Sequence, residues 1–184
     1  MSTLMNIKEA DVDTPQKRQR FTIGIVGGGS TLLQHVCVFA EAGFSVVAAD
    51  VNHKLINLSK RDAVSSTDSM FTPLLKKYLK DELVTLTSNV GKTTSRSDVI
   101  IFLVQPSITE KKKPDYSKIE KACKEVGMSL RSRCLVVVAS TVGPGVTEGL
   151  VKETLENASG LRAGVNFGLA YCPLYVGSEI FAKN

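Results

Sequence analysis

The chain has 184 residues, enough for one ordinary domain with its own core and too few for two large domains. Hydrophobic residues make up 43% and charged residues 22%, which excludes wholesale disorder, and no apolar run approaches the ~20 residues that span a bilayer. The net charge of +5 comes largely from short solvated clusters at 17–20 and 111–113, so neither nucleic acid nor a membrane is expected as a partner.

Residues 1–20 are polar, carry Pro15 and charges of both signs, and predict a flexible N-terminal arm. Residues 21–184 predict one domain, in which apolar runs of strand length alternate with helical patterns. Gly43 is expected to end the first helix. Strands are expected at 21–26, 45–49, 83–87, 99–104, 134–139 and 165–171, and helices at 31–42, 53–60, 71–80, 114–126 and 146–157.

The strands are apolar throughout, which is typical of parallel strands that are buried on both faces. Helices lie between them in the sequence, and right-handed crossovers then leave few topologies. The expected fold class is α/β, with a Rossmann-type, doubly wound, mostly parallel sheet and helices on both faces.

A glycine-rich turn joins the first strand to the first helix and consists of Gly27, Gly28 and Gly29, followed by Ser30 and Thr31. A dinucleotide fingerprint lies at this place in the fold. Gly27 and Gly29 are expected at the tight turn and at the point where a pyrophosphate approaches, because a Cβ there would keep the phosphates from the backbone. The helix amides and the two hydroxyls would then donate to the phosphates.

Asp50 follows about 20 residues later, at the end of the second strand, where such an acid accepts hydrogen bonds from the adenosine ribose. It also repels a 2′-phosphate, so NAD is expected over NADP, although His53 and Lys54 could weaken that preference. Leu32 replaces the third glycine of the fingerprint, so the helix is expected slightly farther from the strand. The glycine-rich turn and Asp50 are each weak signals alone, but their order along the chain, with strand and helix between them, predicts NAD binding.

A metal site is not expected, since no two of the four cysteines have CxxC spacing and the only histidines are His35 and His53. The N-terminus lacks the apolar segment of a secretory signal, and a cytoplasmic location is therefore expected.

Three further segments follow strand ends, where ligands of open α/β sheets bind. They are Val104-Gln105-Pro106, residues 139–147 and residues 171–174. Each segment alone is explained equally well as a loop that ends a strand.

Together with the glycine turn, these segments resemble the N-terminal NAD-binding domain of the UDP-glucose/GDP-mannose dehydrogenase family, over Phe21–Ile180. The similarity is greatest to the UDP-N-acetylmannosamine dehydrogenases. The most specific match is the stretch Ser140-Thr141-Val142 with Pro144-Gly145-Val146-Thr147, which is similar to the family's S-T-V-x-P-G-T-T.

The resemblance implies a two-step, NAD-dependent oxidation of the C6 alcohol of a sugar nucleotide, such as a UDP-sugar, to a carboxylate. The second step passes through a thiohemiacetal on a catalytic cysteine. The resemblance also implies that Val104, Gln105, Pro106, Ser140 and Thr141 lie beside the cofactor. Thr141 would be the catalytic residue of this segment, orienting a water or a substrate group near the nicotinamide. A homodimer is a further expectation.

The sequence departs from the family pattern at three points. Leu174 stands where the family has a glutamate, and Gln105 replaces the usual threonine before Pro106. The chain also ends before the regions that hold the catalytic cysteine and lysine, so it is expected to bind NAD without turnover. Two alternatives stay open: a non-catalytic dinucleotide-binding relative, and a dehydrogenase domain of the 6-phosphogluconate or 3-hydroxyisobutyrate type. The Ser140–Thr147 stretch argues against the second.

Overall fold

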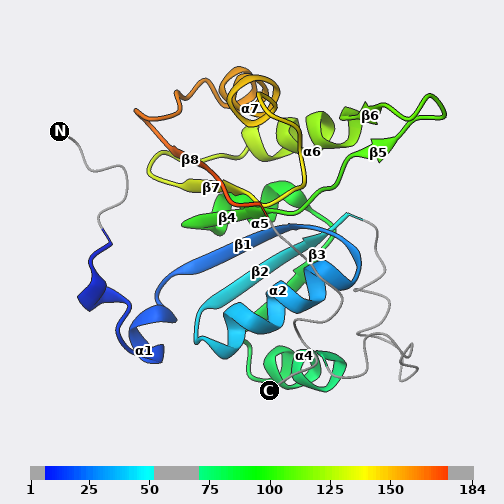
Figure 1. Cartoon of the computed structure of the whole chain (residues 1–184). Coiled ribbons are helices and arrows are strands. Elements are labelled where there is room, and N and C mark those ends of the chain that lie inside the picture. The colour runs from blue at the N-terminus through cyan, green and yellow to red at the C-terminus, as the bar shows by residue number, and fades with distance from the viewer. Residues whose placement is uncertain (1–6, 52–70, 174–184) are drawn as a thin grey trace.

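The structure is a computed structural model that describes residues 7–51 and 71–173. Its main sheet has six parallel strands in the order β3-β2-β1-β4-β7-β8, which confirms the expected doubly wound α/β fold (Figure 1). The strands are β1 (Thr22–Gly27), β2 (Ser45–Asp50), β3 (Val84–Thr87), β4 (Val99–Phe102), β7 (Leu135–Val138) and β8 (Gly168–Tyr171).

Helices cover both faces of this sheet, and each face has its own core (Figure 1). On one face lie α2 (Gly29–Glu41) and α4 (Phe71–Lys80), which bury Leu32, Val36 and Leu75. On the other lie α5 (Val90–Arg96), α6 (Ser117–Gly127), the π-helical η2 (Thr147–Val151) and α7 (Lys152–Ser159). No helix in the described ranges combines the length and the apolar character that crossing a bilayer requires.

The sheet has its topological switch point between β1 and β4. The chain leaves β1 through α2 toward β2 and β3, whereas it leaves β4 through α6 toward β7 and β8. The connections therefore diverge at the carboxyl ends of β1 and β4, and such divergence leaves a crevice that ligands of this fold class occupy.

Several elements differ from the sequence prediction. Helix α5 and the hairpin of β5 (Ser107–Ile108) and β6 (Pro114–Asp115) were not predicted. Helix α6 begins at Ser117 and not at residue 114, because the two residues of β6 pair with β5 instead. The helix expected at 53–60 lies outside the described residues.

Part of the segment expected as a flexible arm is folded. It contains η1 (Glu9–Asp11) and α1 (Pro15–Arg18), which has Pro15 at its start and a hydrogen bond from the Lys17 amide to the Thr14 hydroxyl. The Arg18 guanidinium donates to the carbonyl of Ala42 at the end of α2 and to that of Val12. A cation at a helix C-terminus is favourable, so this contact ties the segment to the domain.

Candidate functional site

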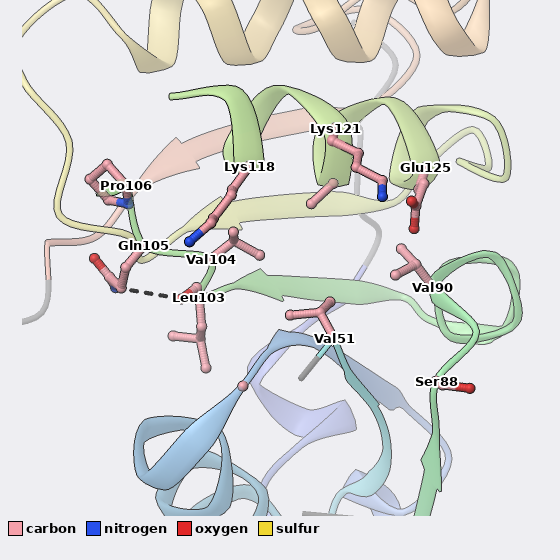
Figure 2. Close-up of a pocket in the computed structure, with 12 residues that line it drawn as sticks. Val51, Ser88, Val90, Leu103, Val104, Gln105, Pro106, Lys118, Lys121 and Glu125 are labelled. Atoms are coloured by element: carbon pink, nitrogen blue, oxygen red, sulfur yellow. Dashed lines mark hydrogen bonds between the residues drawn. The ribbon is translucent and has the colours of Figure 1, made fainter. Parts of the chain in front are cut away.

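A cleft of about 620 Å³ opens at the switch point (Figure 2). One side is formed by the glycine turn and by the residues that follow β2 and β4, and the other by one face of α6. The lining residues are Gly28, Val51, Ser88, Val90, Leu103, Val104, Gln105, Pro106, Lys118, Lys121, Ala122 and Glu125. Of the residues predicted to bind a cofactor, Gly28, Val104, Gln105 and Pro106 belong to this lining.

The structure gives a different reason for glycine at each of the three positions of the turn. Gly27 is buried at the end of β1, and a Cβ there would lie 2.8 Å from the Cβ of Leu103. Its missing side chain therefore lets the exits of β1 and β4 approach each other, a packing reason that the sequence analysis did not include. Gly28 is extended and lines the cleft.

Gly29 begins α2 with φ +75, a backbone conformation that residues other than glycine rarely adopt. A Cβ on Gly29 would have no heavy atom within 4 Å, so the space above it is open. Ser30 is exposed and Thr31 is partly buried in the same first turn. The first amides of a helix lack partners within the helix, and they combine with this open space to make a cradle for an anion.

Leu32 is fully buried between α2 and the sheet. It therefore contributes core packing at the position where the fingerprint has a third glycine.

Asp50 is the last residue of β2 and lies beside Gly27 in the parallel register, as the sequence predicted. Its side chain is fully buried and does not line the cleft. The next residue, Val51, is 37% exposed, lines the cleft and donates its amide to the Gly27 carbonyl at 2.9 Å. A ribose contact from Asp50 thus requires its carboxylate to be uncovered.

Gln105 and Thr141, which follow different strands, are joined directly. The Thr141 amide donates to Gln105 Oε1 at 2.9 Å, and Gln105 Nε2 donates to the Leu103 carbonyl at 3.5 Å (Figure 2). Ser140 is fully buried, and its hydroxyl donates to the Phe102 carbonyl at 3.2 Å. The exits of β4 and β7 are therefore held together, with the exposed Thr141 beside Gln105 at the edge of the cleft.

Two tyrosines hold the loop after Thr141. The Gly143 amide donates to the Tyr116 hydroxyl at 3.2 Å, and the Tyr171 hydroxyl donates to the Val142 carbonyl at 3.4 Å. This loop is thus attached to the residue before α6 and to the end of β8.

The sequence did not predict the wall that α6 contributes to the cleft, which consists of Lys118, Lys121, Ala122 and Glu125. Their spacing of three and four residues places them on one helix face. The polar face of an amphipathic helix usually contacts solvent, so the sequence carries no signal that this one faces a cleft.

Three of the four cysteines are buried in the core of the domain. Burial raises the pKa of Cys37 to about 11 and the pKa values of Cys123 and Cys134 to about 12. Cys172, just after β8, is exposed, and Leu174 lies outside the described residues. Across residues 7–51 and 71–173, no three His, Cys, Asp or Glu side chains gather as a metal site would require.

Comparison with known proteins matches residues 21–181 to the NAD binding domain of the UDP-glucose/GDP-mannose dehydrogenase family. UDP-N-acetyl-D-mannosamine dehydrogenase from Pyrococcus horikoshii is 30% identical over 151 residues, which are 82% of this chain and 35% of that protein. GDP-mannose 6-dehydrogenase from Pseudomonas aeruginosa is 29% identical over 169 residues, 89% of this chain and 37% of that one.

A solved structure of similar fold also comes from a nucleotide-sugar dehydrogenase. NDP-N-acetyl-D-galactosaminuronic acid dehydrogenase from Methanosarcina mazei Go1 superposes with a TM-score of 0.76 at 26% identity, over 89% of this chain and 38% of that one. The chain spans little more than a third of the length of these relatives.

Proposed function

The chain belongs to the UDP-glucose/GDP-mannose dehydrogenase family as its NAD-binding domain, and from this premise we propose that the cleft between β1, β4 and α6 holds the NAD. The observation that supports this placement most directly is the open cradle over Gly29, next to Gly28 in the cleft lining. A side chain at Gly29 would stand in that open space, which the diphosphate would occupy.

Different residues of the chain would bind different parts of the cofactor. Gly28, Gly29 and the first turn of α2, with Ser30 and Thr31, would hold the diphosphate. Asp50 would accept hydrogen bonds from the adenosine ribose. The nicotinamide end would lie toward the group of residues at the exits of β4 and β7, namely Val104, Gln105, Pro106, Ser140 and Thr141.

The reaction served by this site is the oxidation of the C6 alcohol of a sugar nucleotide, of which a UDP-sugar is our first choice. The relatives from Pyrococcus and Pseudomonas are named for sugar nucleotides, which supports this substrate class. NAD, when bound, supplies the hydride acceptor. Thr141 would orient a water or a substrate hydroxyl, since its backbone is held by Gln105 while its side chain is exposed.

Because the chain belongs to this family, the alternative of a dehydrogenase domain of the 6-phosphogluconate or 3-hydroxyisobutyrate type is excluded. A non-catalytic dinucleotide-binding relative is the second candidate, which Leu174 favours because leucine cannot transfer a proton where the family has a glutamate. Homodimer formation and a cytoplasmic location stay predictions.

Calorimetric titration of the 184-residue chain with NAD and NADH tests the first proposal. We expect saturable binding and thermal stabilisation, about 2.7 kcal/mol when the ligand is at a hundred times its Kd. The proposal would be contradicted if millimolar dinucleotide produced no heat of binding and no thermal shift. NADH formation with a panel of UDP-sugars, by a protein that includes the regions its relatives have, separates the enzyme from the non-catalytic candidate.

A further inference from the structure

Helix α6 presents two lysines to the cleft from the side opposite the glycine turn. Lys118 and Lys121 both line the cleft; Figure 2 shows Lys118 extending toward the exit of β4 near Gln105, and Lys121 extending toward Glu125 on the same helix face. Glu125 lies at the other end of the same helix face, toward Val90. The wall therefore carries Lys118 at one end, and Lys121 and Glu125 side by side at the other.

The two lysines are not engaged in ion pairs within the described part of the chain. The ion pairs within 4.0 Å there join Lys17 with Asp13 and Arg131 with Asp98. Asp115 is a neighbour of Lys118, and its pKa is lowered, mainly by hydrogen bonds from Ser117 and least by Lys118. Both ammonium groups are thus available to an anion in the cleft.

We propose that Lys118 and Lys121 are the side-chain cations that bind the phosphates of the ligand, which makes α6 the second half of the diphosphate site. This inference rests on the proposed function. A phosphate chain placed between the α2 amides and the two ammonium groups would be bound from both sides, in a cleft whose walls strengthen electrostatic attraction.

The apolar part of the cleft sets the direction of the ligand. Val90 lies away from Lys118, below Glu125, and Val51 lies across the cleft from α6; both offer apolar surfaces to a neutral aromatic base and not to a phosphate. The ligand class that fits is an adenine nucleotide with two phosphates, its base between the valines and its phosphates under the lysines.

The test uses Lys118→Met combined with Lys121→Met, because methionine keeps much of the aliphatic stem while removing the charge. The matched control is Lys124→Met, an exposed lysine of the same helix that does not line the cleft. Each chain is titrated calorimetrically with NADH, ADP-ribose, AMP and adenosine, at low and at high salt.

We expect the double variant to bind NADH and ADP-ribose about tenfold more weakly, since two partly exposed ion pairs would be lost. AMP should lose less and adenosine nothing, and the salt dependence of ADP-ribose binding should flatten. Lys124→Met should behave as the unmodified chain.

Unchanged ADP-ribose affinity in the double variant would overturn this inference while the proposed function stands. An equal loss for adenosine would also overturn it, because the lysines would then act through packing. If the unmodified chain binds neither NADH nor ADP-ribose, the proposed function fails first, and the inference fails with it.

Discussion

Replacing Gly29 with alanine separates the backbone reason for this glycine from the ligand reason. Without ligand, the new Cβ meets no heavy atom within 4 Å, so the cost is the strain of a side chain at φ +75. That strain is about 1–2 kcal/mol. For a chain of this length it lowers Tm by roughly 2–8 °C.

With ligand, the same Cβ stands in the space that the proposal gives to the diphosphate. We expect Gly29→Ala to weaken NAD at least about tenfold, or ~1.4 kcal/mol, beyond any effect on folding. Calorimetric titration with NAD, run well below the lowered Tm, measures the affinity of the folded protein and so excludes the stability loss.

Gly160 provides the matched control for this experiment. It ends α7 with φ +70, and a Cβ on it would also have no heavy atom within 4 Å, but it does not line the cleft. Gly160→Ala should therefore lose similar stability and keep its NAD affinity. If Gly29→Ala binds NAD as the unmodified chain does, or if both variants lose affinity equally, the cradle is misplaced.

Three further predictions follow from buried groups and close packing. Asp50→Asn should weaken NAD more than NADP, because it removes the charge that repels a 2′-phosphate; parallel titrations give the ratio, and an unchanged ratio means that Asp50 does not face the ribose. Gly127→Ala should lower the free energy of unfolding, measured by thermal unfolding, by about 1–3 kcal/mol, because its Cβ would lie 2.6 Å from the Ala158 Cβ. Adding Ala158→Gly should recover part of this loss; no recovery would mean that the clash is not the cause. A thiol reagent at mildly alkaline pH should label Cys172 first, and Cys172→Ser should remove the fast phase; a second fast thiol would contradict the burial that raises the other pKa values. Those thiolates form only as pH rises toward about 11 for Cys37 and about 12 for Cys123 and Cys134.

The sheet was predictable because buried parallel strands leave a strong pattern in the sequence. Helix α5 was not, since its short sequence contains Gly91, Thr93 and Thr94, which are weak helix formers. Its stability comes from tertiary contacts: both threonines are fully buried, and the Ser97 hydroxyl after the helix donates to the Thr93 carbonyl at 2.7 Å. The β5–β6 hairpin escaped prediction for a related reason, because two-residue strands carry no periodicity.

The two sides of the cleft differ in how far the sequence reveals them. At Gly29 the left-handed backbone conformation favours glycine over other residues, so the requirement is visible in the sequence as a glycine. The wall at Lys118 and Lys121 needs only positive charge on one helix face, which a solvated helix shows equally well, and the crossover from β4 into α6 decides what that face meets. Changes on α6 should therefore tune affinity while the ligand keeps its place, whereas a side chain at Gly29 should displace the ligand. The structure of a Lys118 and Lys121 variant with bound ADP-ribose would test this difference directly, because a shifted diphosphate would mean that α6 positions the ligand as well as attracting it.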